Sequence, residues 1–403
     1  MSELIKKVKF PPIVQIASQA LSLAPKDKKL ISFGQGVAFF GPPKYILEKT
    51  LDEWKNPDHF VHRYNLDQGL SSLRETIAEF ERKRYQLPEL NPNKEIMITA
   101  GANQACYNAI KALCSPGDEV IIFSPFYFNH EMAIAMEGLK LNLVPVNIES
   151  LTIDIEELEK SITSRTKLLI YVNPNNPTGV LETKETLLKI FGLLEKHPYL
   201  WFLSDETYAE FIYNTDITGP FYSAGAIENN CKDRIIIVRS FSKAWGMAGW
   251  RLGYLIYPMS LNESLLKIQD TIVVSSPVPS QLLGEACLKW SDGINWLEEK
   301  IQKINEVRMY LMNNLIDNSF FKLDKNSSTG QSAFYIFPKL FLPSNKNSDQ
   351  FVENLVRQEG VLILPGSAFG VQWKKNVRIS FGNVSMEQAM EGIERINNFS
   401  AFY

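Results

Sequence analysis

Residues 240–254, SFSKAWGMAGWRLGY, bring two hydroxyls, an amine and a guanidinium together at the end of an apolar run. Two hydroxyls and a guanidinium suit a phosphate group, because arginine forms forked, charge-assisted hydrogen bonds. The amine of Lys243 could be a further charge ligand for the phosphate, or a nucleophile that condenses with a carbonyl group. The first alternative favours a GxxxxGK[ST] loop, which the sequence lacks. The second requires a carbonyl cofactor with a phosphate handle, and pyridoxal phosphate is such a cofactor.

Pyridoxal phosphate would need further partners, and the sequence offers them after other apolar runs. The ring nitrogen should keep its proton so that the ring can accept electrons, and Asp205 is placed for this task. The phenolic oxygen needs hydrogen-bond donors, which Asn176 and Tyr208 can supply. The Gly101–Asn103 turn opens a helix and adds backbone N–H groups for the phosphate. One face of the ring needs an aromatic partner from the stretch PFYF: Phe126, Tyr127 or Phe128.

The stretch NPNNPTG (173–179) carries more turn-forming residues than a simple turn requires. It must stop a strand, turn sharply and place Asn176 over the edge of the cofactor. Pro174 and Pro177 stiffen the turn, so that the amide is held in position in advance. Gly179 permits a backbone conformation that other residues resist.

These residues follow short apolar runs that each predict a buried strand: EIMITA (95–100), EVIIFS (119–124), KLLIYV (167–172), LWFLSD (200–205) and RIIIVRS (234–240). The runs lack polar alternation, which is typical of parallel strands covered on both faces. Helical segments such as 103–114 and 184–197 separate them. This alternation predicts an α/β fold with a mostly parallel mixed sheet flanked by helices. Since ligands bind outside the carboxyl ends of such strands, the polar residues there predict one shared pocket.

The end of the chain has a different pattern. Segments 293–316 and 386–399 predict helices, and segments 333–340 and 376–382 predict alternating strands. LISFGQG (30–36) predicts a short strand and turn, so the N-terminal segment joins this second unit. We therefore expect a smaller α+β domain built from both chain ends. The expected limits are 1–45 for the N-terminal segment, 46–285 for the large cofactor-binding domain and 286–403 for the C-terminal small domain.

The order of these motifs resembles the fold type I pyridoxal-phosphate-dependent aminotransferases, class I/II, of aspartate-aminotransferase-like build. Their pattern YxxxxGxxxLR, NPxNPTG, DExY, SxSKxxxxxGxRxG and a late arginine has counterparts here in Tyr64–Arg74, Asn173–Gly179, Asp205–Tyr208, Ser240–Gly253 and Arg378. The resemblance covers nearly the whole chain, and the combination is far more specific than any single motif.

The resemblance implies roles for the matched residues. Lys243 would form the Schiff base and move a proton between the substrate Cα and the cofactor C4′. Asp205 would pair with the ring nitrogen, Asn176 and Tyr208 would bond the phenolic oxygen, and Tyr127 would stack on the ring. The phosphate would be held by the turn and the side chains of Gly101, Ala102, Asn103, Ser240, Ser242 and Arg251.

The substrate and the assembly are implied in the same way. Arg378 would bind the substrate α-carboxylate, helped by Asn176 and the backbone of Gly36. Tyr64 resembles the tyrosine that reaches the phosphate of the neighbouring subunit, which implies a homodimer with active sites at the interface. The substrates would be an L-amino acid and a 2-oxo acid. The apolar stretch VAFF (37–40) favours a hydrophobic, aromatic or neutral side chain, and no clear second arginine stands ready for a distal carboxylate.

Two other functions compete with transamination. A pyridoxal-phosphate-dependent β-lyase of the cysteine-conjugate type, or a related ring-closing lyase, would use the same residues. A non-catalytic binding module would carry a winged-helix extension, and the residues before ISFGQG are too few for one.

Composition excludes other classes. The net charge is -3, with 42 basic and 45 acidic residues well mixed, so nothing indicates nucleic acid or an anionic membrane as a partner. Apolar runs are too short for a bilayer span, and no secretory signal is evident. The 4 cysteines have no CxxC spacing and the 4 histidines no ligand spacing, which favours reduced thiols in the cytoplasm and no metal site.

Overall fold

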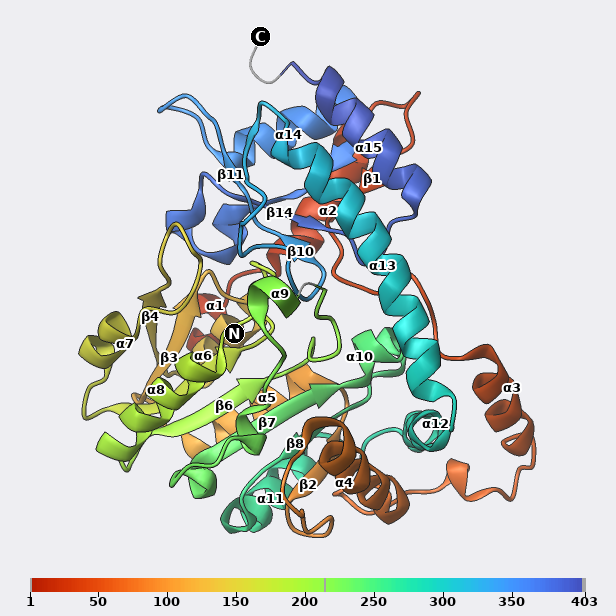
Figure 1. The fold of residues 1–403 in the computed structure, drawn as a ribbon. Coiled ribbons are helices and arrows are strands. Elements are labelled where there is room, and N and C mark those ends of the chain that lie inside the picture. The colour runs from red at the N-terminus through yellow and green to blue at the C-terminus, as the bar shows by residue number, and fades with distance from the viewer. Residues whose placement is uncertain (1, 214, 401–403) are drawn as a thin grey trace.

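The larger lobe of the molecule is built around a seven-stranded sheet with strand order β2-β8-β7-β6-β5-β3-β4 (Figure 1). A computed structural model describes residues 2–213 and 215–400. Neighbouring strands are parallel except at β8, which is antiparallel to both β2 and β7. The strands are β2 (Ile96–Thr99), β3 (Glu119–Ser124), β4 (Lys140–Pro145), β5 (Thr166–Val172), β6 (Trp201–Asp205), β7 (Ile235–Ser240) and β8 (Gly253–Ile256).

Both faces of this sheet are buried, which explains the unbroken apolar runs. Successive strand residues point to opposite faces, and in β3 the neighbours Ile121 and Ile122 belong to two different hydrophobic clusters. The cluster on one face includes α5 (Ala102–Leu113) and α11 (Asn262–Val273). The cluster on the other face includes α4 (Ser71–Tyr85) and α8 (Lys184–Lys196). The other helices of this part are α3 (Lys44–Glu53), α6 (Phe128–Met136), α7 (Ile155–Ser161), α9 (Thr215–Thr218), α10 (Phe241–Ala244) and α12 (Val278–Lys289).

The smaller lobe joins the two ends of the chain. Strand β1 (Ile31–Ser32) pairs in parallel with β12 (Val361–Leu362). An antiparallel sheet has the order β10-β14-β13, from β10 (Tyr335–Ile336), β14 (Val377–Ser380) and β13 (Leu364–Pro365), and β11 (Lys339–Leu340) pairs with β9 (Phe321–Lys322). The long helix α13 runs from the larger lobe to the smaller one (Figure 1). Helix α1 (Glu3–Lys7) packs on α6. The remaining helices are α2 (Pro12–Leu23), α13 (Gly293–Ile316), α14 (Ser348–Glu359) and α15 (Met386–Asn398).

The predicted strands coincide with β2, β3, β5, β6 and β7, but two strands of the large sheet, β4 and β8, were not predicted, and neither were the short strands β9, β12 and β13 of the smaller lobe. Strand β4 lies at the sheet edge with most of its residues partly or fully exposed, so its polar side chains interrupt the apolar pattern. Strand β8 has only 4 residues, and its first two, Gly253 and Tyr254, are the last two of the polar motif. The pattern also predicts one strand over 333–340, whereas the chain forms β10 and β11 in separate sheets, because Pro338 between them has no N–H to donate. The expected limit at residue 285 lies inside α12, and a domain limit inside a helix is unsuitable. We therefore propose to place the limit between the lobes after α12.

Candidate active site

A cavity of about 300 Å³ lies at the carboxyl edge of the large sheet and is also lined by β10 and β14 of the smaller lobe. The structure brings the predicted site residues together around it, except Gly101, which precedes the lining residue Ala102, and Tyr64. Tyr64 is 89% exposed and lies between α3 and α4. Further lining residues, which the sequence pattern did not single out for the site, are Ile13, Val14, Val172, Thr207 and Tyr335.

Lys243 stands in the four-residue helix α10, directly after β7. Its Nζ donates a hydrogen bond to the carbonyl of Gly36 at 2.5 Å. Burial, followed by the positive charges of Arg378 and Arg251, lowers the pKa of Lys243 to about 8, and the opposing charge of Asp205 does not offset this. An amine with such a pKa is neutral in a large fraction near pH 8, which is the form that attacks a carbonyl carbon.

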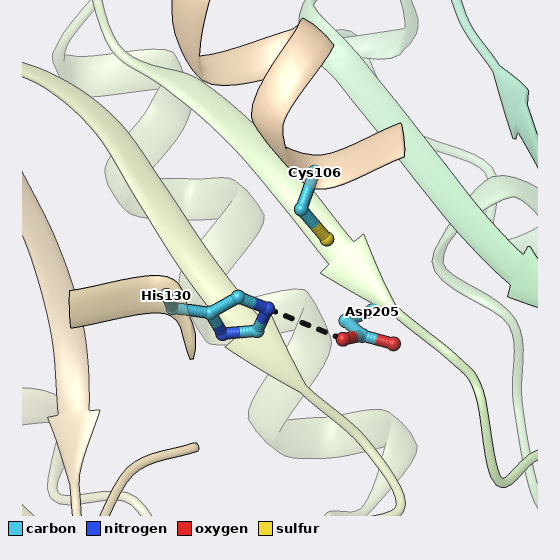
Figure 2. A group of neighbouring side chains, drawn as sticks. All are labelled: Cys106, His130 and Asp205. Carbon is cyan, nitrogen blue, oxygen red and sulfur yellow. Dashed lines mark ion pairs between the residues drawn. The ribbon is translucent and has the colours of Figure 1, made fainter. Parts of the chain in front are cut away.

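Asp205 ends β6 and is held by His130 from α6 (Figure 2) and by Thr207, which follows β6. The Nε2 atom of His130, in α6, lies 3.3 Å from Asp205 Oδ2. Thr207 donates to Oδ1 from both its hydroxyl, at 2.6 Å, and its backbone N–H, at 3.2 Å. Burial raises the pKa of the carboxyl, but the hydrogen bond and charge of His130 and the bonds from Thr207 outweigh burial, so the pKa lies below its ordinary value. Asp205 is therefore an anchored anion.

The thiol of Cys106 approaches the same pair, so that three possible metal ligands lie close together (Figure 2). Burial, with the nearby charge of Asp205, raises the pKa of the Cys106 thiol well above its ordinary value. A metal requires the thiolate, and both carboxylate oxygens of Asp205 already accept bonds. The cluster is thus suited to orienting Asp205 rather than to holding a metal.

A cradle for an anion lies on another side of the cavity. Gly101 has φ +85, and a Cβ there would lie 2.4 Å from Nη2 of Arg251, so the guanidinium lies directly against the turn that opens α5. The Ser240 hydroxyl accepts from the N–H of Ser242 at 3.1 Å, which orients the two serines beside this turn. A guanidinium, two hydroxyls and a helix N-terminus form a typical phosphate site.

The NPNNPTG turn uses its three asparagines for three different bonds. Asn173 accepts from the Glu182 N–H at 2.9 Å, and Asn175 accepts from the Thr178 hydroxyl at 2.8 Å. This leaves Asn176 to point into the cavity, where its Oδ1 accepts from Arg378 at 2.9 Å. The expectation for Gly179 is confirmed, because its φ is +66 and a Cβ would lie 2.1 Å from the Tyr335 carbonyl. Both X–Pro bonds of the turn are cis.

Arg378, on β14, is a buried cation with uncharged partners. Its side chain donates to Asn176 and, at 2.6 Å, to the carbonyl of Gly34, while Nε has no hydrogen-bond partner within the described part of the chain. Its guanidinium lies over the rings of Tyr335 and Phe369, at 4.4 Å and 4.9 Å from their centroids. Burial lowers the pKa of Arg378, but arginine stays protonated in proteins. A buried cation without a counter-charge is suited to binding an anion.

Three tyrosines complete the cavity wall. The Tyr208 hydroxyl bonds to that of Tyr335, and burial raises the pKa of Tyr208 well above its ordinary value, so the phenol stays protonated and can donate. Tyr127 lies at the start of α6 with its ring 5.5 Å from that of His130, and burial raises its pKa to about 12. Phe128 also lines the cavity, whereas Phe126 packs in the hydrophobic cluster with α5.

Two residues of the site had no usable signal in the sequence. His130 is one of 4 scattered histidines, whose spacing indicates no site. Tyr335 lies in AFYIF, which predicts an ordinary core strand. An isolated sequence does not say which face of α6 or β10 meets the cavity. A histidine or tyrosine inside an apolar run is nevertheless a signal that the residue could belong to a site.

The fold thus brings a buried lysine, an anion cradle and an unpaired arginine into one cavity at the carboxyl edge of the large sheet. Residues 28–396 match the family described as aminotransferase class I and II, and the chain belongs to that family. It is 32% identical over 92% of its length to the aromatic aminotransferase ISS1 of Arabidopsis thaliana, covering 89% of that protein. It is also 32% identical to an aspartate aminotransferase of Pyrococcus abyssi, covering 92% of each chain.

Solved structures agree with this assignment. The chain matches the aromatic aminotransferase of Pyrococcus horikoshii with a TM-score of 0.83 at 30% identity, over 94% of this chain and 97% of that one. It matches the aspartate aminotransferase of Thermus thermophilus with maleate at a TM-score of 0.89 and 26% identity, over 99% of each. The protein is an aminotransferase, and these relatives favour that activity over the lyase alternative. Among the described residues, no helix is both long and apolar enough to cross a membrane.

Proposed function

We propose that this aminotransferase uses pyridoxal phosphate to move the amino group of a hydrophobic, aromatic or neutral L-amino acid to a 2-oxo acid. The observation that carries the proposal is the position of the Lys243 amine in one cavity with an anion cradle at Arg251 and an unpaired cation at Arg378. The cradle suits a phosphate and the cation suits a carboxylate. Lys243 lines the same cavity, so its amine is within reach of both a cofactor held by its phosphate and a substrate held by its carboxylate.

The residues present fit the cofactor on several independent grounds. A Cβ at Gly101 would fill the space against Arg251, as expected of a cradle reserved for an anion. Asp205 is a buried carboxylate whose low pKa suits a protonated ring nitrogen. Tyr208 is a protonated phenol able to donate. When bound, pyridoxal phosphate supplies an electron-accepting ring and a carbon that takes the amino group.

The chain would supply the rest of the chemistry. Arg378 and Asn176 would bind the α-carboxylate and so orient the substrate Cα toward Lys243. The Lys243 amine, with its pKa near 8, would accept the Cα proton and deliver it again. His130 and Thr207 would keep Asp205 ionised, and thereby a proton on the ring nitrogen. The two lobes around the cavity would limit the access of water.

The wall of the cavity supports a neutral side chain. Ile13, Val14, Phe128 and Val172 contribute apolar atoms. Of the described residues that line the cavity, the only lysine and arginines are Lys243, Arg251 and Arg378, all with other tasks in the proposed site. A distal carboxylate, as in aspartate, would be buried without a cation, which costs several kcal/mol.

A donor panel tests the activity and the preference together. Pyridoxal-phosphate-loaded protein would be mixed with phenylalanine, leucine, glutamine or aspartate without an oxo acid. We expect the kcat/KM for conversion of the bound cofactor to the amine form to be at least about tenfold higher with phenylalanine than with aspartate. Release of ammonia and pyruvate from a cysteine S-conjugate, without such conversion, would instead support the lyase.

We also propose a homodimer. The segment around α3 stands out from the body of the molecule (Figure 1). It carries exposed apolar side chains of the kind that interfaces cover, namely Tyr45, Leu51, Phe60, Tyr64 and Leu66. Sedimentation of Leu66→Glu should give monomers, whereas Met390→Glu, at an exposed apolar position on α15, should sediment like the wild type. Unchanged sedimentation of the first variant would contradict the proposal.

We propose the cytoplasm as the working compartment. The four cysteines are all free thiols, and three of them are buried. Reduced thiols suit a reducing compartment. Cell fractionation would test this directly.

A further inference from the structure

Tyr335 lies where the two lobes meet at the cavity. It belongs to β10 of the smaller lobe and is 1% exposed. Its hydroxyl bonds to that of Tyr208, which follows β6 of the larger lobe. The guanidinium of Arg378 lies over the Tyr335 ring, 4.4 Å from the ring centroid. One side chain therefore touches both the proposed donor to the cofactor and the proposed carboxylate site.

Tyr335 packs closely against two glycines, Gly36 and Gly179. A Cβ at Gly36 would lie 1.9 Å from the Tyr335 hydroxyl oxygen, so that position admits only glycine while the tyrosine is there. A Cβ at Gly179 would lie 2.1 Å from the Tyr335 carbonyl oxygen. The carbonyl of Gly36 also accepts the bond from Lys243. Both the hydroxyl and the backbone of Tyr335 are thus fixed against groups of the proposed site.

The charged and titratable groups around the two phenols set the direction of their hydrogen bond. Arg378 from β14, Tyr127 from the start of α6, Lys243 from α10 and Asp205 from β6 line the same cavity. Burial raises the pKa of Tyr208 and of Tyr335, so both phenols stay protonated. When the Tyr208 hydroxyl donates its proton to a bound cofactor, it can only accept from Tyr335. The cation over the Tyr335 ring makes its hydroxyl a better donor.

We propose that Tyr335 is a positioning residue that donates to the Tyr208 hydroxyl, aims it at the cofactor oxygen beside Lys243, and couples this bond to carboxylate binding at Arg378. The inference rests on the proposed function and deepens it. Occupation of Arg378 by a carboxylate weakens the pull of the cation on the Tyr335 ring. The bond that the Tyr208 hydroxyl donates to the cofactor oxygen then becomes weaker, and the proton affinity of the Lys243 nitrogen rises.

Spectrophotometric pH titration of the cofactor-loaded protein without substrate tests this. A hydrogen bond to the deprotonated form of the bound cofactor lowers the pH of its absorbance change. Tyr335→Phe keeps the ring over Arg378 and removes only the hydroxyl, so we expect the midpoint to rise by about 0.5–1 pH unit, a three- to tenfold change. We expect the shift of the midpoint caused by saturating 3-phenylpropionate to fall by at least half.

Matched variants separate this role from a merely structural one. Tyr171→Phe removes another buried hydroxyl, one without a hydrogen-bond partner within the described residues, and should leave the midpoint unchanged. In a Tyr208→Phe background, Tyr335→Phe should move the midpoint by no more than about 0.1 unit, because the effect passes through Tyr208. If Tyr335→Phe does not fold, 3,5-difluorotyrosine at position 335, a stronger donor, should lower the midpoint instead.

The outcomes distinguish this inference from the proposed function. A wild-type protein that forms no absorbing adduct with pyridoxal phosphate would contradict the proposed function itself. A wild-type protein with the adduct, but with the same midpoint in Tyr335→Phe or an equal shift in the Tyr208→Phe background, would overturn only the role of Tyr335.

Discussion

Arg239 and Arg378 are both buried arginines on strands, but their surroundings differ. Arg239, on β7 beside the site, donates to both oxygens of Glu81 at 3.1 Å and lies 3.0 Å from Glu206. Its guanidinium is also 3.7 Å from the ring centroid of Tyr85. Burial alone would lower the pKa of Arg239, but the two carboxylates raise it well above its ordinary value. Arg378 has a carbonyl, an amide and aromatic rings instead.

The difference teaches how to tell a structural charge from a functional one. Arg239 is neutralised within the chain, so its charge adds rigidity to the strand that leads into α10 and Lys243. Arg378 keeps a charge that nothing in the described chain neutralises, and an outside carboxylate can do so. Burial is nearly the same for both, at 4% and 1% exposure, so burial alone would not separate them.

The largest expected effect comes from removing the unpaired charge. Arg378→Leu should lower kcat/KM by about 10³–10⁴, or about 4–5.5 kcal/mol, because the carboxylate loses two charge-assisted bonds in a dry site. The free energy of unfolding should stay the same or rise, since a buried unpaired charge is lost. Steady-state kinetics and urea unfolding measure the two quantities. A large loss of stability with normal kcat/KM would mean that Arg378 is structural.

The paired arginine should respond in the opposite way. Arg239→Met leaves Glu81 and Glu206 buried without their cation, which should lower the free energy of unfolding by about 3 kcal/mol. Urea unfolding measures this loss, and Lys303→Met, at a surface ion pair, serves as a control with a change under about 1 kcal/mol. An Arg239→Met protein as stable as the wild type would remove the basis of the comparison.

The pH dependence of stability gives a third contrast, because the pKa of Lys243 is shifted into an accessible range. Lys243 has a pKa of about 8 in the fold and an ordinary value of 10.5 when unfolded. Between these values the unfolded chain binds more protons, so this residue makes stability rise with pH. From pH 8 to 9.5, the unfolding free energy of the cofactor-free protein should gain about 1–2 kcal/mol relative to Lys243→Met. An equal pH dependence in both proteins would contradict this pKa.

The smallest expected effect concerns the support of Asp205. His130→Phe removes the ring nitrogen 3.3 Å from the carboxylate and leaves an aromatic ring beside Tyr127. Because a hydrogen bond to a charged group is worth about 1.5 kcal/mol, kcat should fall about tenfold. The activity should also be lost at a higher pH on the acidic side, since the pKa of Asp205 rises. An unchanged kcat and acidic limb would mean that Thr207 alone suffices.

The sequence was sufficient to predict the fold class and to group the site residues, for physical reasons. Buried parallel strands leave apolar runs, and their carboxyl ends meet at one edge, so residues such as Asp205 and Asn176 could be assigned to one pocket. The roles of His130 and Tyr335 depend on how α6 and β10 pack against that edge. Packing of this kind involves residues up to 127 positions apart, which no local pattern encodes.

The central claim is that Lys243 holds the cofactor, and chemical trapping tests it most directly. The purified protein would be loaded with pyridoxal phosphate, reduced with borohydride, digested and mapped by mass spectrometry, with Lys243→Ala treated in parallel. We predict one stoichiometric pyridoxyl label on Lys243 in the wild type and none at the site in the variant. A label confined to another lysine, or a wild-type protein that takes up no cofactor, would contradict the account.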